Sequence, residues 1–143
     1  MTGPMDEVRA RGRVSIVLRG PDGEVKDQRH NTVTTSGKEG IADNLLAAPA
    51  LGKPTHMAVG TGAPAANALG AEVDRNALTS KTRAGAIVTM VGDWAAGDAT
   101  DALTEAGTFN DPAAGNMWLS TSFPVINKGA DDTLQITWTL EIE

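Results

Sequence analysis

Apolar and polar residues alternate strictly over residues 133–143, which read TLQITWTLEIE. The apolar residues on every second position are Leu134, Ile136, Trp138, Leu140 and Ile142. Successive side chains of a β-strand point to opposite faces, so this pattern predicts a strand with one apolar and one polar face. At helical spacing the same apolar residues would scatter around the axis, which argues against a helix. One buried and one solvated face favour an antiparallel sheet.

A weaker form of this alternation predicts further strands along the chain. Val14, Ile16 and Leu18 indicate a first strand, and the Pro-Asp-Gly sequence at 21–23 is typical of a turn. A second strand over residues 24–30 is polar enough to be expected at an exposed edge. Other strands are predicted over residues 55–59, 76–82, 85–94, 102–109 and 116–123. Strands at this spacing, separated by turn sequences, are typical of a sandwich or barrel.

One helix is predicted, over about residues 37–48. Ser36 and Glu39 have the spacing of a capping box, in which two side chains satisfy free backbone donors at the start of a helix. Pro49 would end this helix. The apolar residues expected to line one of its sides are Ile41, Ala42, Leu45 and Leu46.

These elements predict a mainly β fold, an antiparallel β-sandwich with one short α-helix. The sandwich is expected to form a single domain over residues 13–143, because 143 residues fit the length of one domain. Residues 1–12 are polar and lack periodicity, so we expect them to form an N-terminal arm that is mobile or held by a neighbouring subunit.

Composition and charge narrow the classes of function. The formal charge of −6 argues against a nucleic-acid partner, because binding phosphates requires a basic surface. The absence of cysteine excludes disulfides, thiolate zinc sites and cysteine nucleophiles. The first residues show no apolar segment typical of a secretory signal, and no apolar run approaches the ~18 residues of a membrane span. A soluble protein without a membrane span is therefore expected.

No catalytic or ligand-binding motif is complete in the sequence. Ser36-Gly37-Lys38 lacks the preceding glycine and the following hydroxyl residue of a phosphate-binding loop. The two histidines, His30 and His56, are far apart and show no metal-ligand spacing. Four acidic residues in predicted loops could in principle bind a cation, but their spacing matches no calcium-binding loop. They are Asp98, Asp101, Asp131 and Asp132. We expect no catalytic residue, no cofactor and no metal site.

Glu105 is a carboxylate inside a predicted strand. Such a group must face water or be paired when it is buried. One interpretation is an exposed strand face. The other is a partly buried ion pair between Glu105 and Arg75, which would hold the loop after Gly60 against the sheet.

A series of five short motifs resembles a family of tailed-bacteriophage virion proteins. In order, the motifs are NTVTTSGKEGIADNLL, THMAVGTG, EVDR, LTEAGTF and KGADDTLQITWTL. The members are described as phage structural, minor tail or tail-fibre-like proteins, and similar small modules occur as head decoration or fibre proteins. The resemblance spans about residues 31–142, and the order of the motifs makes it specific.

The resemblance implies a non-catalytic β-rich module that assembles on a virus particle, commonly as an oligomer. We therefore predict a bacteriophage virion structural protein, present in the virion as a decoration, fibre or minor tail component. The expected partners are other phage virion proteins of the capsid or tail, and further copies of the chain, with a trimer favoured. The candidate oligomer or docking contacts are Met5, Val8, Trp94 and Trp118.

Two other functions remain open at this point. A carbohydrate- or receptor-binding adhesin module would use an exposed Trp94 or Trp118 to stack on a sugar. A cation-dependent hydrolase would need a loop site at Asp98, Asp101 or Asp131, with carboxylates that converge on one metal ion.

Overall fold

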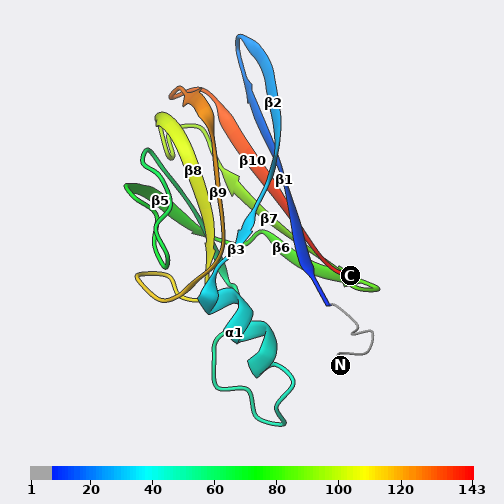
Figure 1. Ribbon diagram of the computed structural model, residues 1–143. Coiled ribbons are helices and arrows are strands. Elements are labelled where there is room, and N and C mark those ends of the chain that lie inside the picture. Colours follow the sequence, from blue (N-terminus) through cyan, green and yellow to red (C-terminus); the bar gives the residue numbers. More distant parts are fainter. Residues whose placement is uncertain (1–7) are drawn as a thin grey trace, which may run out of the picture.

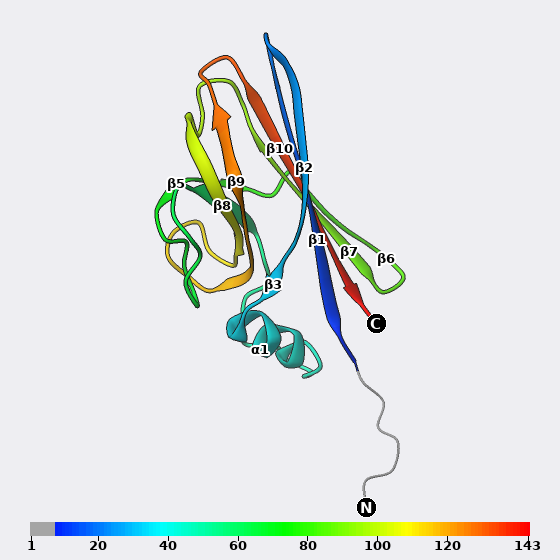
Figure 2. The same cartoon turned by 45° about the horizontal axis from the view of Figure 1, so that its top comes forward.

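The computed structural model describes residues 8–143. Over this range, ten strands form two five-stranded sheets, and one helix lies outside the sheets (Figure 1). Every strand pair is antiparallel. Figure 2 shows the sheets as two layers that face each other. The predicted antiparallel β-sandwich with one short helix is confirmed.

The first sheet is centred on the strand that the clearest alternation predicted. Its order is β2 (Gly23–His30), β1 (Ala10–Gly20), β10 (Thr133–Ile142), β7 (Ile87–Trp94) and β6 (Ser80–Ala84). Within β10, Trp138 lies opposite Val14 of β1 and Met90 of β7, and all three side chains are buried. The polar β2 is at the edge of the sheet, as its composition predicted.

The second sheet supplies the other half of the core. Its order is β3 (Thr32–Val33), β9 (Met117–Lys128), β8 (Asp101–Phe109), β4 (His56–Gly60) and β5 (Glu72–Ala77). Met57, Leu103 and Leu119 from this sheet join Ile136 and Trp138 from the first sheet in one apolar cluster. The core therefore lies between the two layers, as the one-sided patterns require.

The prediction of a single strand over residues 76–82 is wrong. β5 ends at Ala77 in one sheet, and β6 begins at Ser80 in the other sheet. Leu78 and Thr79 make the crossing, where the backbone nitrogen of Thr79 donates to the carbonyl of Val91 at 2.8 Å. A continuous strand is excluded because the chain changes layers at this point.

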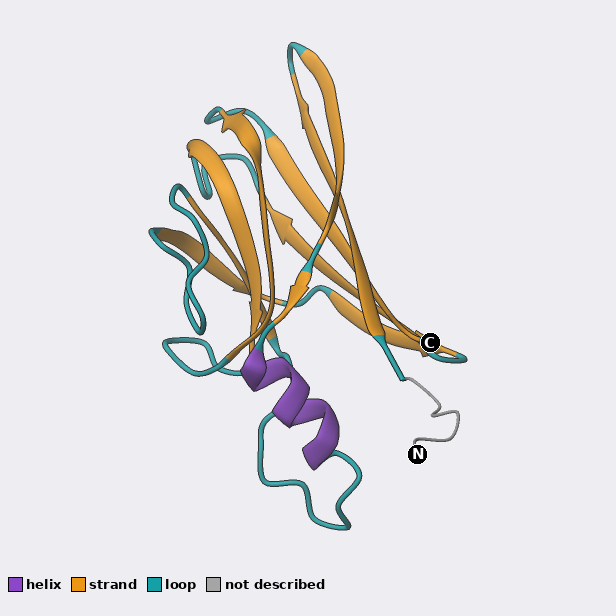
Figure 3. Ribbon diagram, in the orientation of Figure 1, coloured by secondary structure: helices purple, strands orange, loops and turns teal. Residues whose placement is uncertain are grey.

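The helix α1 (Thr35–Asp43) is shorter than predicted. Its N-cap is Thr34, whose Oγ1 accepts a hydrogen bond from the backbone nitrogen of Gly37 at 2.9 Å, so the predicted capping box from Ser36 to Glu39 is wrong. Thr34 is the N-cap because its hydroxyl also contacts the carbonyl oxygens of Met117 and Trp118, which fixes the start of the helix on β9. Figure 3 shows α1 and the loop after it at one end of the sandwich.

The sandwich begins earlier than residue 13. β1 starts at Ala10, and Arg9 is already paired with Glu143 through two backbone hydrogen bonds of 2.9 and 2.7 Å. The predicted arm over residues 1–12 therefore ends too late, since residues 10–12 belong to the sheet; residues 1–7 lie outside the described part. Between residues 8 and 143 no helix is long and apolar enough to cross a membrane.

Candidate docking surface

Glu105 is fully buried in β8 and binds backbone amides. Its Oε2 accepts hydrogen bonds from the nitrogens of Gly62 and Ala71, each at 2.8 Å. Its Oε1 accepts from the nitrogen of Gly70 at 2.7 Å. The neighbouring Thr104 donates its hydroxyl to the carbonyl of Gly62 at 2.7 Å. This cluster holds the loop after β4 against β8, as the interpretation of a buried Glu105 expected.

The predicted partner of Glu105 was wrong, because Arg75 binds elsewhere. Arg75 donates from Nη2 to Glu72 at 2.6 Å, and from Nη1 to the carbonyls of Asp111 and Ala114 at 2.9 and 2.8 Å. Its guanidinium also lies 3.7 Å above the centre of the Phe109 ring.

The register of the strands explains this difference. Glu105 is aligned with Gly60 on β4, whereas Arg75 is aligned with Ala58, two residues away. Both oxygens of Glu105 are occupied by backbone donors, so the carboxylate needs no cation to compensate its burial. Glu105 is therefore a structural residue that fastens a loop.

The tryptophans predicted as contact residues are in the core. Trp94 is 1% exposed and Trp118 is 6% exposed, so neither presents an open ring face on which a sugar could stack. Trp118 does line part of a groove beside α1, together with Leu119. Trp94 is the last residue of β7 and lies opposite Leu134, on the apolar face. Val8 is 79% exposed, and Met5 lies outside the described residues.

The acidic loop residues do not build a cation site in this part of the chain. Residues 8–143 contain no group of three or more histidine, aspartate or glutamate residues that could hold a metal ion. Asp101 instead accepts a hydrogen bond from the nitrogen of Ala102 at 2.8 Å, and Asp132 accepts one from the nitrogen of Gly129 at 2.7 Å. The convergent carboxylates that the hydrolase hypothesis required are not found among the described residues.

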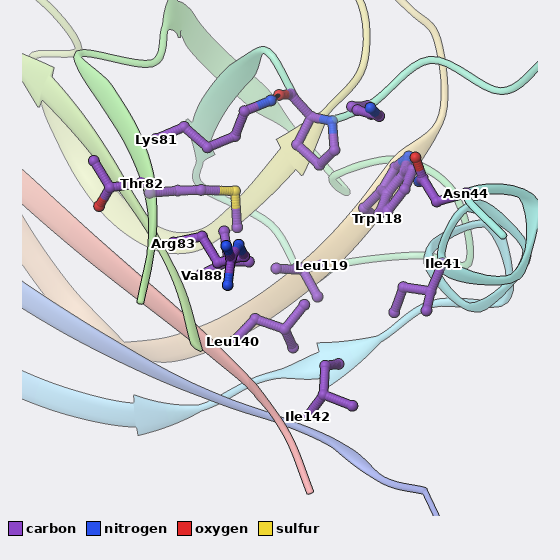
Figure 4. A pocket seen from close by; sticks show the side chains of 13 residues that line it. Ile41, Asn44, Lys81, Thr82, Arg83, Val88, Trp118, Leu119, Leu140 and Ile142 are labelled. Atoms are coloured by element: carbon purple, nitrogen blue, oxygen red, sulfur yellow. Dashed lines mark hydrogen bonds between the residues drawn. The ribbon is translucent and has the colours of Figure 1, made fainter. Parts of the chain in front are cut away.

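A groove of about 560 Å³ opens between the two sheets beside α1. Figure 4 shows Ile41 of α1 and Ile142 of β10 bordering the same space, with Leu119 and Leu140 between the sheets. Val88 and Met90 from β7 extend this apolar lining. The groove therefore exposes the end of the core that neither sheet closes.

Two glycines of α1 determine how closely the helix lies to this groove. A Cβ atom on Gly40 would lie 2.0 Å from the ring of Trp118, and one on Gly37 would lie 2.2 Å from the Trp118 carbonyl oxygen. Helix and β9 are thus in contact through positions that have no side chain. The contact places Ile41 on the wall of the groove.

The polar side of the groove is basic. Lys53, Lys81 and Arg83 line it, and no carboxylate does. Lys81 donates from Nζ to the carbonyl of Pro54 at 2.6 Å. Partial burial lowers the pKa of Lys81 from its ordinary value of 10.5, and the positive charge of Lys53 lowers it further. An anionic group placed here would oppose both effects.

Exposed leucines lie on the loop that follows α1, between Asn44 and Lys53, which both line the groove. Leu45, Leu46 and Leu51 are 89%, 60% and 37% exposed, whereas the sequence predicted that Leu45 and Leu46 would line a helix face. The prediction was wrong because α1 ends at Asp43, whose carboxylate instead accepts from the nitrogen of Leu51 at 2.9 Å and closes the loop. We call the groove and these three leucines the α1-end surface.

The α1-end surface combines an apolar floor, three cations and exposed leucines. Such an arrangement can bind an apolar segment that carries negative charge. It holds no arrangement of nucleophile, acid and base, since its titratable lining residues are Lys53, Lys81 and Arg83. Comparison of the chain with protein-family models, with curated proteins and with solved structures finds no match.

Proposed function

We propose that this chain is a non-enzymatic bacteriophage virion structural protein, a small β-sandwich module that assembles in multiple copies as a decoration, fibre or minor tail component. The α1-end surface is the observation that carries this proposal. Single exposed apolar residues are common on proteins, whereas neighbouring leucines beside an apolar groove mark an interaction site. The resemblance of the five motifs to phage virion proteins supports the kind of particle.

The residues of these motifs also support a structural role, because several of them hold the fold together. Glu105 of LTEAGTF fastens Gly62 of THMAVGTG, and Thr34 of the first motif ties α1 to β9. Arg75 of EVDR joins the loop over residues 110–115 to β5. Each of these polar groups is used within the fold, which is what a scaffold module requires.

The composition of the α1-end surface favours repeated, moderate contacts. The leucines provide contact area, but the aromatic residue that lines the groove, Trp118, is 6% exposed and offers little surface as an anchor. Many identical copies on one particle compensate for weak single contacts, because a second contact becomes intramolecular once the first has formed. A decoration, fibre or minor tail protein meets this condition.

Virions purified from the phage that encodes the chain provide the test. Mass spectrometry should detect the protein in them, and gold-labelled antibodies should locate it on head or tail. A chain absent from the particles would refute the proposal.

Variants then test the surface itself. Leu45→Asp with Leu46→Asp should leave the melting temperature nearly unchanged, because both residues are exposed, and should lower incorporation into particles at least about tenfold. Val125→Asp on β9 is the matched control, since Val125 is 56% exposed and lies outside the α1-end surface. Val8→Asp tests the one predicted contact that the structure leaves exposed. Equal incorporation of the leucine variant and the control would exclude the leucines from docking.

A further inference from the structure

We propose that the groove of the α1-end surface binds residues 1–7 of a second copy of this chain. Each copy would then insert its own segment into the next copy. This inference rests on the proposed assembly in multiple copies and names the contact between neighbours. It assigns an occupant to the groove from the chemistry of both sides.

The apolar part of the segment fits the apolar walls. Residues 1–7 read MTGPMDE, and their apolar members are Met1, Pro4 and Met5. Methionine adapts to irregular apolar surfaces because its side chain is unbranched and polarizable. The groove, at about 560 Å³, lies within the range of roughly 300–1,000 Å³ that is typical of ligand pockets.

The charged part of the segment fits the basic side. Asp6 and Glu7 directly follow Met5, and the groove offers Lys53, Lys81 and Arg83 without any carboxylate. The chain as a whole carries a charge of −6, so two copies repel each other over most orientations. The groove is a local exception, and complementary charge there selects the orientation in which two copies meet.

The position where β1 starts indicates that the segment in the groove comes from a second copy and not from the same chain. Arg9 is held beside Glu143 by two backbone hydrogen bonds, so the strand is still extended where the described chain begins. Ala10 is aligned with Ile142, which lines the groove, so the described chain begins near the groove of its own copy. A return into that groove would need a reversal at once, and Asp6 and Glu7 would lie in the turn. A neighbour can present the same residues as an extended segment.

The proposed contact also determines how several copies assemble. A segment of one copy in the groove of the next is a head-to-tail contact, which generates a ring when the rotation closes. A closed ring of three copies is the predicted trimer. The contact area per neighbour is small, so the ring should form at high local concentration and on the particle.

Charge reversal on either side of the contact tests the proposal in the full chain. One variant carries Asp6→Lys and Glu7→Lys, and the other carries Lys53→Glu and Arg83→Glu. Lys81 is left in place because it holds the carbonyl of Pro54. Lys53 and Arg83 are exposed, and the hydrogen bond from Arg83 Nη1 to the carbonyl of Gly85, at 2.8 Å, is also exposed to water. The second variant should therefore lower the melting temperature only slightly. Sedimentation from about 1 μM to 1 mM covers the affinities expected for weak contacts.

The parent chain should associate as its concentration rises, and each variant alone should associate at least about tenfold more weakly. An equimolar mixture of the two variants should recover pairwise association between unlike copies to within about threefold of the parent, because each segment then meets a groove of opposite charge. A closed ring of three cannot alternate two variants, so the mixture should form pairs and rings with an even number of copies. A parent chain that stays monomeric throughout would overturn the proposal. A mixture that fails to recover, while a single chain with all four changes behaves as the parent does, would place the segment in its own groove and also overturn it.

The same variants separate this inference from the proposed function. Parent protein found in virions together with variants that incorporate equally well would refute the segment-in-groove contact and leave the virion role intact. Parent protein missing from virions would refute the virion role, whatever the sedimentation shows.

Discussion

The carboxylate of Glu105 lies 2.8 Å from the backbone nitrogen of Gly62, and this contact joins β8 to a loop that is 43 residues away in the sequence. The same carboxylate binds Gly70 and Ala71, so one buried charge organises both ends of the segment between β4 and β5. Backbone donors replace water for the charged group, which allows it to be fully buried. Burial of a carboxylate is here a device for holding a loop.

Removal of this carboxylate should be costly. Glu105→Ala removes three part-buried hydrogen bonds from backbone nitrogens to a charged acceptor, and hydrogen bonds to charged groups contribute about 1.5–3 kcal/mol each. We expect the free energy of unfolding to fall by at least about 3 kcal/mol, measured by urea denaturation. Glu105→Gln should cost less, because its carbonyl oxygen still accepts. Glu141→Gln, at an exposed carboxylate in β10, is the control and should change the value by less than about 0.5 kcal/mol.

Glu105 and Arg75 should act independently in a double-mutant cycle. They do not form the predicted ion pair, and their partners are different. The effects of Glu105→Gln and Arg75→Gln on the free energy of unfolding should therefore add to within about 0.5 kcal/mol. A coupling energy above about 1 kcal/mol would show that the two charges meet in solution after all.

Trp138 should contribute more to stability than its neighbours in the same strand. Its side chain is fully buried between β1 and β7, so Trp138→Ala should lower the free energy of unfolding by about 3–5 kcal/mol. Thr137→Ala and Thr139→Ala lie on the opposite face and should each cost under about 1 kcal/mol. Thermal denaturation followed by circular dichroism can measure all three. Equal effects would contradict the one-sided burial of β10.

The strands with clear alternation were the most predictable part of this fold. β10 and β1 repeat apolar residues at every second position, and the burial of Val14, Ile16 and Trp138 follows directly from that period. β6 was less predictable, because all of its residues are exposed and its short sequence carries no apolar pattern. Its place in the sheet depends on pairing with β7, which is a contact between strands.

The candidate site was less predictable than the fold for the same reason. Leu45 and Leu46 have the spacing of a helix face, but α1 ends first and the loop closes through Asp43. Trp94 and Trp118 look like contact residues in a chain with few aromatics. The alternation of β7 places Trp94 inward. β9 shows no such alternation at Trp118, whose ring is instead covered by Gly40 of α1. The groove combines residues from α1, β6, β7, β9 and β10, and no local pattern reports such a combination.

Gly40 should be intolerant of a side chain although it lies in a helix. Alanine forms helices better than glycine by about 1 kcal/mol, which taken alone predicts a gain in stability from Gly40→Ala. The new Cβ would lie 2.0 Å from the Trp118 ring, so helix or ring must move and the variant should be destabilised. Glu39→Ala, at an exposed position of the same helix, should have little effect. Tryptophan fluorescence should shift only in the Gly40 variant, since Trp118 would gain access to water.

Lys81 should make the free energy of unfolding depend on pH in the alkaline range. Burial first, and the charge of Lys53 second, lower its pKa in the folded chain below the ordinary value of 10.5, which it regains on unfolding. Between these two values the unfolded chain binds more protons, so the free energy of unfolding should rise with pH in this window. Below the folded pKa, Lys81 is charged in both states and contributes no slope. Lys53→Gln should raise the pKa of Lys81 and flatten the rise, as measured by NMR titration and by denaturation at several pH values. Lys26→Gln, on the edge strand β2, is the control and should leave the titration of Lys81 unchanged. A Lys81 that titrates at 10.5 in the folded chain would mean that its amine is fully solvated.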